Sequence, residues 1–497
     1  MRLLILQSEK YRTFAAKIFD MQFNSFVFLL FLPVVFLLYW QLKRSLRWQN
    51  VLVVVSSYVF YGWWDARFLL LIAMTSLLSY GSGVLMERLG SDRRRQKAVC
   101  VGNVAVNLAI LAVFKYYNFF AENLVLLLQT VGIHVDWVTL QVVLPVGISF
   151  YTFQALSYTV DVYRGEVRAT HDVVAFLAYI SFFPQLVAGP IERATRLLPQ
   201  FLQERRFDYS LAVSGCRLML WGFFKKMVIA DNCAVLVNSV WDNYATEPAP
   251  VLLIAAVLFT FQIYGDFSGY SDIAIGCARL FGIRLMRNFH FPYFAASIAD
   301  FWRRWHISLT TWLRDYVYIP LGGSRQGLMR TLRNTFIVWG ISGLWHGANW
   351  TFVCWGLYHA LLLSIYRLTH QHPVKKAGEG SVAATVSTFA LVVVGWIIFR
   401  ATSMSEAMAY IGRMMGASWA DLPLAVGRMR TLLPDLIVPL GAIALMMVME
   451  WRRQHGRSPL PQPFFVHTGL RYGLYVVVAI LTIALAGSQS EFIYFQF

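Results

Sequence analysis

Long apolar runs recur along almost the whole chain, separated by short polar and basic connections. An α-helix needs about 20 mostly apolar residues to cross a bilayer, and runs approaching that length return repeatedly after Met21. The clearest runs cover residues 26–40, 99–114, 251–264, 382–399, 436–449 and 472–486. The pattern predicts an all-α, polytopic membrane protein with roughly 10–13 transmembrane helices.

Composition and charge agree with this prediction. Hydrophobic residues make up 58% of the 497 positions and charged residues only 14%, against roughly 25% charged in soluble domains. The net charge of +17 comes from 43 basic and 26 acidic residues, and basic clusters fall at 43–47, 93–97, 325–333 and 452–457. Because these clusters lie in short connections beside apolar runs, they indicate cytoplasmic helix ends and not a nucleic-acid surface.

Three segments differ in character. Residues 1–20 alternate basic and apolar positions, which favours an N-terminal extension such as an interfacial helix. Residues 21–490 carry the membrane pattern, and residues 491–497 form an aromatic C-terminal motif. The five cysteines are scattered, without a Cys-x-x-Cys pair or histidines at ligand spacing, so we expect neither a disulfide framework nor a metal site.

Residues 144–164 are unusually polar for an apolar segment and include Gln154. Polar side chains at membrane depth turn toward protein or toward a wet cavity. We therefore consider two interpretations equally: Gln154 and its polar neighbours line a tunnel, or they make ordinary hydrogen bonds between helices.

The central third of the chain concentrates polar chemistry in aromatic surroundings. The sequence QIYGDFSGYSD (262–272) places Asp266 and Tyr270 directly after an apolar run. The stretch DFWRRWHISLTTWLRDYVYIP (300–320) follows soon after and is too polar to face lipid.

Read at helical spacing, residues 300–320 have two faces. One is apolar, and the other carries Arg303, His306, Thr310 and Arg314. Asp300 precedes Arg303 and Arg304 by three and four residues, a spacing that allows a local ion pair. We interpret the stretch as one interfacial or re-entrant helix that presents His306 inward; the alternative is a solvated cytoplasmic face with aromatic interface anchors.

A second histidine, His346, lies in GLWHGANW (343–350), inside a predicted hydrophobic span over about 336–363 that also contains Asn349. Imidazole, with a reference pKa near 6.5, exchanges a proton near neutral pH, and desolvation favours its neutral, basic form. We hypothesise that His346 deprotonates a hydroxyl acceptor that attacks an activated acyl group. His306, helped by Arg303 or Arg304, would orient the carbonyl or stabilise the oxyanion. For either histidine alone, a structural hydrogen-bonding role is about equally favoured.

Several ordered motifs resemble the membrane-bound O-acyltransferases, and within them the bacterial alginate O-acetylase-like branch. They are VGISFYTFQALSYTVDVYRG (146–165), SFFPQLVAGPI (181–191), QIYGDFSGYSDIAIG (262–276), DFWRRWHISLTTWLRDYVYIPLGG (300–323) and GLWHGANWTFVCWG (343–356). The resemblance implies a many-helix fold around a central tunnel, with His346 at the catalytic histidine and His306 at the second characteristic position. Asp300, Arg303, Arg304, Asp266, Tyr270, Asn349 and Gln154 would line the tunnel or bind the donor.

The C-terminal FIYFQF also resembles a motif of this branch, in which a tyrosine is thought to accept the acyl group. Tyr494 would then receive the acetyl group and pass it to a periplasmic acetyltransferase partner; the alternative is an aromatic anchor at the membrane interface.

Together these observations predict an O-acetyltransferase of the bacterial inner membrane. No cofactor is expected to be bound; acetyl-CoA would be the donor substrate and an exported polysaccharide, best guess alginate, the acceptor. Cellulose, peptidoglycan and a D-alanyl or acyl-carrier-dependent reaction are alternatives. A transporter or channel is the non-enzyme alternative, because buried charges and broken helices are typical of transporters too.

Overall fold

The computed structural model describes residues 21–134, 145–186, 189–369, 381–416, 422–456, 467–490 and 492–493, and helices dominate these ranges, which contain no β-strand. Six stretches of these ranges are long and apolar enough to cross a membrane: Leu46–Arg88, Arg93–Thr130, Ala249–Leu280, Trp350–Thr369, Val382–Arg400 and Pro423–Gln454. Phe26–Gln41 and Thr468–Ala484 are shorter apolar helices. The all-α, polytopic membrane prediction is confirmed, whereas the number of crossings stays a prediction.

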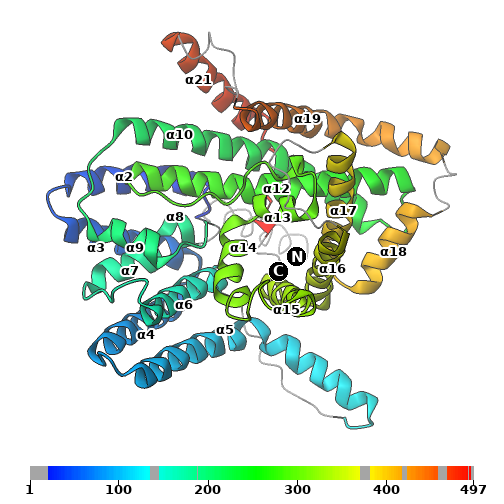
Figure 1. Ribbon diagram of the computed structural model, residues 1–497. Helices are drawn as coiled ribbons and strands as arrows, with labels where there is room; N and C mark the ends of the chain where they lie inside the picture. The colour runs from blue at the N-terminus through cyan, green and yellow to red at the C-terminus, as the bar shows by residue number, and fades with distance from the viewer. Residues whose placement is uncertain are drawn as a thin grey trace, which may run out of the picture. The chain divides into compact units, whose positions relative to one another are not determined.

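The described residues fall into two compact units, of which the first comprises residues up to Met219 together with Asp272–Met286. Its elements are α2 (Phe26–Gln41), α3 (Leu46–Asp65), η1 (Ala66–Phe68), α4 (Leu69–Arg88), α5 (Arg93–Thr130), α6 (Ile148–Arg164), α7 (Val173–Ser181), α8 (Phe183–Leu186), α9 (Ala194–Leu202) and most of α10 (Tyr209–Phe223). Ser25 and Ser45 cap α2 and α3 by accepting a hydrogen bond from a backbone N–H in the first turn. Figure 1 shows α4, α5 and α6 packed together.

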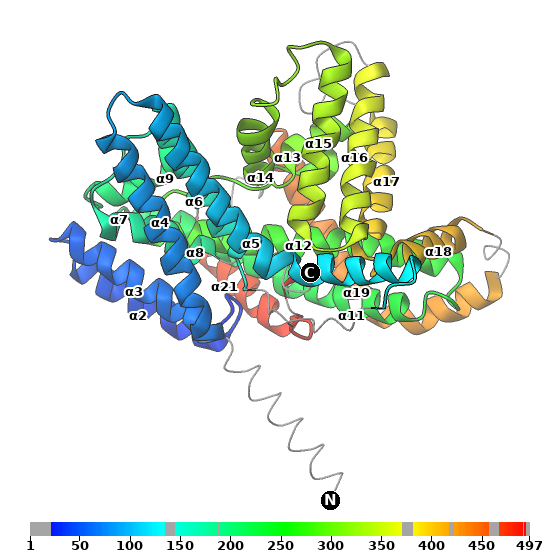
Figure 2. The same ribbon diagram turned by 90° about the horizontal axis from the view of Figure 1, so that it is seen from below.

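The second unit comprises Leu220–Ser271 and the chain from Arg287 onward, so α12 contributes residues to both units. Its elements are η2 (Phe224–Ala230), α11 (Asp231–Asp242), α12 (Ala249–Leu280), η3 (Pro292–Phe294), α13 (Ile298–Arg304), α14 (Ile307–Leu313), η4 (Arg314–Tyr318), α15 (Leu328–His346), α16 (Trp350–Thr369), α17 (Val382–Arg400), α18 (Met404–Met415), α19 (Leu422–Gln454) and α21 (Thr468–Ala484). Figure 2 shows α15, α16 and α17 standing side by side. Two elements, η2 and η4, are π-helices, a wider helical form that frequently marks functional positions.

Buried aromatic side chains form the core of the second unit. Trp305 packs against Phe301 of α13 and Trp396 of α17, with ring centroids 5.5 and 4.9 Å apart, respectively. Phe289 meets the same indole edge-on at 5.0 Å. Rings of this size bury large apolar areas with specific packing geometry, so they help to hold the short segments between the helices.

Candidate active site

His306 lies at a break between two short helices. α13 ends at Arg304, α14 begins at Ile307, and His306 has φ 44° and ψ 53° in the left-handed region. This region costs a residue with a Cβ roughly 1–2 kcal/mol, so the surrounding contacts must hold it there. The continuous helix predicted over 300–320 is therefore wrong, since the stretch consists of α13, the break, α14 and η4.

Asn288 supplies the contacts that hold the break. Its side chain is fully buried, and its backbone oxygen accepts a hydrogen bond from the backbone N–H of Ile307 at 2.9 Å. Its Oδ1 accepts from the hydroxyl and the backbone N–H of Ser308 at 2.9 and 3.3 Å, and its Nδ2 donates to Ser271 Oγ at 3.1 Å. Asn288 thus binds the first N–H groups of α14, which a continuous helix would pair internally.

His346 is the last residue of α15 and does not lie inside a long helix. The continuous span predicted over 336–363 is wrong, because α16 begins only at Trp350. Asn349 explains the break: its Oδ1 accepts a hydrogen bond from the backbone N–H of Thr351 at 3.0 Å, capping α16, and its Nδ2 donates to the backbone oxygen of Thr402 at 2.9 Å. The two helices form a tight hairpin with His346 at the turn.

A glycine allows this hairpin to close. A Cβ on Gly343 would collide with the backbone of Phe352, so α15 and α16 touch directly one turn before His346. The His346 ring then packs among three aromatic rings, those of Trp345, Trp355 and Phe399, at centroid distances of 5.0, 4.9 and 5.4 Å. The imidazole is therefore held by packing in apolar surroundings.

The two helix ends bring the histidines together. The ring centroids of His306 and His346 lie 6.3 Å apart at an angle of 54°, and the two residues are only 1% and 6% exposed. Phe267 of α12 meets the His306 ring edge-on at 4.7 Å.

Both histidines line one cavity of about 950 Å³. Its wall also contains Arg303, Thr310 and Arg314, so the whole polar face predicted on residues 303–314 reaches this cavity despite the break in the helix. Arg367, near the end of α16, was not predicted and joins them. The three arginines are exposed, whereas the histidines are buried, so the cavity changes from cationic to aromatic toward the imidazoles.

Asp300 and Arg304 form the predicted ion pair, with Arg304 Nη2 2.9 Å from Asp300 Oδ2. Neither residue is among those that line the cavity. Arg304 is 2% exposed, and its Nη1 donates to Gln454 Oε1 at the end of α19 at 3.2 Å. The pair therefore ties α13 to α19 and leaves Arg303 as the arginine of this helix that faces the cavity.

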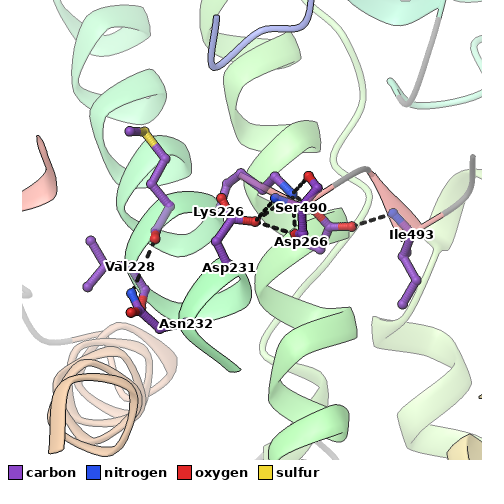
Figure 3. Close-up of polar contacts among 8 residues, drawn as sticks. Lys226, Val228, Asp231, Asn232, Asp266, Ser490 and Ile493 are labelled. Carbon is purple, nitrogen blue, oxygen red and sulfur yellow. Dashed lines mark hydrogen bonds and ion pairs between the residues drawn. The ribbon is translucent and has the colours of Figure 1, made fainter. Parts of the chain in front are cut away.

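Asp266 and Tyr270 lie on α12 in a buried cluster that also does not line the cavity. Asp266 Oδ1 pairs with Lys226 Nζ at 2.8 Å, and Oδ2 accepts a hydrogen bond from the backbone N–H of Ile493 at 2.7 Å (Figure 3). The ring of Tyr270 packs on Phe492 at 4.3 Å. These two predicted site residues therefore contact the C-terminal tail.

Comparison with known proteins shows the family to which this chain belongs. The model of the membrane-bound O-acyltransferase family matches residues 164–404, which include both histidines and the cavity arginines. A probable alginate O-acetylase of Pseudomonas putida is 38% identical over 502 residues, covering 96% of this chain and all of the relative. The chain belongs to the membrane-bound O-acyltransferase family.

Two further relatives support this family assignment. A probable alginate O-acetylase of Pseudomonas aeruginosa is 42% identical over 390 residues, which cover 78% of this chain and 73% of the relative. A peptidoglycan O-acetyltransferase of Helicobacter pylori is 33% identical over 438 residues and 82% of each chain. The predicted family resemblance and the predicted acyltransferase activity are confirmed.

Gln154 of this O-acyltransferase lies in the first unit, within a hydrogen-bond network. Its Nε2 donates to the backbone oxygen of Tyr179 at 2.7 Å, and its Oε1 accepts from Gln185 Nε2 at 3.0 Å. Its neighbour Thr159 donates to Asn103 Oδ1 at 2.9 Å. Of the two interpretations of residues 144–164, these contacts favour hydrogen bonding between helices, and a role of Gln154 in a tunnel stays a prediction.

Three residues in or near the site were not predicted from the sequence, namely Asn288, Arg367 and Lys226. Asn288 carries no local signal, because its partners Ser271 and Ser308 lie 17 and 20 residues away. Arg367 carries none either, because it reaches the site only where the fold brings the end of α16 to the cavity. Lys226 does carry one: it belongs to a Lys-Lys pair inside the apolar stretch 218–230, where two buried cations require acidic or polar partners. Tyr494 lies outside the described residues, and its predicted role stays a prediction.

Proposed function

We propose that this O-acyltransferase moves acetyl groups from acetyl-CoA, bound in the arginine-lined cavity, to a hydroxyl acceptor, with His346 as the general base. The observation that supports the proposal is the convergence of His306, His346 and three arginines on one cavity. Its volume lies within the roughly 300–1,000 Å³ of typical small-molecule sites.

The reaction moves one proton from the acceptor hydroxyl through His346 to the leaving thiolate, and it exchanges a C–S bond for a C–O bond at the acetyl carbon. The acceptor oxygen attacks the thioester carbonyl carbon while His346 takes the hydroxyl proton. The C–S bond then breaks, the acetyl group stays on the acceptor oxygen, and the thiolate leaves with the proton that His346 returns. His306, whose ring centroid lies 6.3 Å from that of His346, stabilises the negative charge on the carbonyl oxygen in the tetrahedral intermediate.

The arginines suit a donor that carries phosphate groups. Guanidinium groups bind phosphate through paired, charge-assisted hydrogen bonds, and Arg303 and Arg367 stand at the exposed part of the cavity. Arg367 lies near the end of α16 and the basic cluster 325–333 near the start of its hairpin partner α15. The positive-inside bias therefore supports donor entry from the cytoplasm.

For the acceptor we propose an exported polysaccharide, with alginate as the first candidate, because two of the relatives above carry that substrate in their names. The peptidoglycan-modifying relative makes a peptidoglycan acceptor the second candidate. In this proposal the protein resides in the bacterial inner membrane, and a periplasmic acetyltransferase completes the delivery. Tyr494 would carry the acetyl group between them.

The test uses the full-length protein in lipid nanodiscs with radiolabelled acetyl-CoA and polysaccharide fragments. We expect acetyl transfer or donor hydrolysis by the natural sequence, and a loss of about 10²–10⁴-fold in His346→Ala. His467→Ala, at an exposed position, is the matched control and should retain full activity. Retained activity in His346→Ala would contradict the assignment, and solute flux in proteoliposomes without acetyl transfer would favour a transporter.

A further inference from the structure

The last described residues of the chain are bound inside the second unit. Phe492 and Ile493 are 0% and 2% exposed. Upstream, the backbone oxygen of Leu485 accepts a hydrogen bond from Asn232 Nδ2 at 2.9 Å, and the backbone N–H of Gly487 donates to Met227 at 2.9 Å. We call residues 485–493 the tail; its described positions lie against η2, α11 and α12 (Figure 3).

A buried charge cluster holds the tail. Lys226 Nζ lies 2.9 Å from Asp231 Oδ1 and 2.8 Å from Asp266 Oδ1, and it also donates to the backbone oxygen of Ser490 at 3.0 Å. The Ser490 hydroxyl in turn donates to Asp231, and the Ile493 N–H donates to Asp266. All three charged side chains are at most 3% exposed.

The balance of charge shows why the tail and the cluster need each other. Formally, two carboxylates face one ammonium group, and a buried charge is tolerated only when it is paired and hydrogen-bonded. The tail supplies the further donors, namely the Ser490 hydroxyl and the Ile493 N–H. Without the tail the two carboxylates would share Lys226 alone. Without the cluster Ser490 and Ile493 would lose these partners, and the tail would keep its upstream hydrogen bonds at Leu485 and Gly487.

Close backbone packing places the cluster. A Cβ on Gly269 of α12 would press on the backbone oxygen of Gly222 at 2.8 Å and on the backbone nitrogen of Lys226 at 3.1 Å, so the end of α10 and η2 approach α12 directly. On the other side, a Cβ on Gly487 would meet the backbone nitrogen of Asn232 at 2.7 Å. Larger residues at either glycine would therefore push the lysine or the tail away from the carboxylates.

The tail also contacts an aromatic ring that packs against His306. Phe492 packs on Tyr270 at 4.3 Å and on Phe267 at 6.0 Å, and Phe267 meets the His306 ring edge-on at 4.7 Å. His306 has a strained, left-handed backbone, and its imidazole is surrounded by the rings of Phe267, Trp345 and His346. Loss of the packing behind Phe267 would therefore let the imidazole shift. One aromatic ring separates the tail from a reacting group.

From these contacts we infer that the clamped tail is a positioning element of the active site: Lys226, Asp231 and Asp266 hold Phe492 against Phe267, and Phe267 holds the His306 imidazole. The inference rests on the proposed function for the role of His306. It assigns the three charged residues and Phe492 a task that differs from donor binding, because none of them lines the cavity.

The first experiment measures hydrogen exchange of the tail and acetyl-transfer kinetics in full-length Asp266→Asn. This change keeps the shape of the side chain but removes its charge. We expect exchange protection of residues 485–493 to be lost and kcat to fall about 10–100-fold, with an unchanged KM for acetyl-CoA. Glu247→Gln is the control, since Glu247 is also a buried carboxylate and pairs with an arginine, Arg428, at 2.8 Å. The tail protection and the kcat of Glu247→Gln should equal those of the protein with the natural sequence.

The second experiment changes the tail itself and leaves the charges in place. Phe492→Ala should lower kcat, whereas Phe492→Leu, which keeps most of the packing, should restore much of it. In a His306→Asn background, Phe492→Ala should have no further effect, because both changes act through the same imidazole. Independent, multiplying effects would overturn the inference.

Two outcomes separate this inference from the proposed function. If Asp266→Asn keeps its tail protection, or loses it while kcat stays unchanged, the positioning role is wrong and the proposed function stands. If even the natural sequence transfers no acetyl group, the proposed function fails. Hydrogen exchange then still tests whether the tail positions His306. Increased hydrogen exchange of residues 300–310 in Phe492→Ala would support the positioning role, and unchanged exchange there would overturn the positioning role.

Discussion

His306 and His346 approach each other from two different helix ends, with their ring centroids 6.3 Å apart at an angle of 54°. One ring is placed by a left-handed break between α13 and α14, and the other by the turn of the α15–α16 hairpin. The two supports pack against each other, since Trp302 of α13 meets Trp339 of α15 and Trp355 of α16 with ring centroids 4.4 and 5.5 Å apart.

The left-handed conformation of His306 predicts how substitutions there behave. His306→Asn should fold normally, because asparagine tolerates this region, but its kcat should fall about 10²–10³-fold without the imidazole. His306→Val should lose the same activity and also about 1–3 kcal/mol of stability, because a β-branched residue is strained there. Thermal unfolding of the two variants checks this; equal stability would argue against the break.

Asn288 should matter for both stability and rate. Replacing it by alanine leaves the Ser308 N–H and other buried polar groups without their partner, at a cost of about 1–3 kcal/mol. We expect Asn288→Ala to lower Tm and to lower kcat through the displaced His306. Asn243→Ala is the control, because the Asn243 side chain makes an exposed hydrogen bond to the backbone oxygen of Ser239. If the two variants have equal Tm and kcat, Asn288 does not hold the break.

The arginines of the cavity predict a split between binding and turnover. Arg303→Gln should raise the KM for acetyl-CoA about tenfold, because it removes a charge-assisted contact to phosphate, and should leave kcat nearly unchanged. Acetyl-pantetheine, which carries no phosphate group, should show no such change. Arg453→Gln, at the exposed end of α19, serves as the control. An equal loss for both donors would show that Arg303 does not bind phosphate.

Much of the fold could be predicted from sequence, because the apolar runs that form spanning helices are local features. The polar face of residues 303–314 was also local, and it reaches the cavity as expected. The break after His346 also carried a local signal, since Asn349 caps α16 through the backbone N–H of Thr351. The break at His306 was not predictable in this way, because Asn288 acts on Ser308 across 20 residues and no periodicity reports that contact. The tail clamp is more distant still, since Asp266 and Ile493 are 227 positions apart.

The C-terminal motif yields a prediction from its chemistry alone. Tyr494→Phe keeps the aromatic ring that could anchor in the membrane interface but removes the phenol that would accept an acetyl group. We expect this variant to hydrolyse acetyl-CoA and to acetylate no polysaccharide, as measured by release of labelled acetate and labelling of the acceptor. Full acetylation of the acceptor would exclude the tyrosine relay.

The most direct test of the central claim is a single-turnover measurement on His346→Ala with bound, labelled acetyl-CoA, in which donor affinity is determined separately. If His346 is the base in this cavity, the donor should bind with nearly unchanged affinity, while the first-order rate of acetyl transfer falls by about 10²–10⁴-fold. An unchanged rate of transfer, with the donor fully bound, would contradict the account.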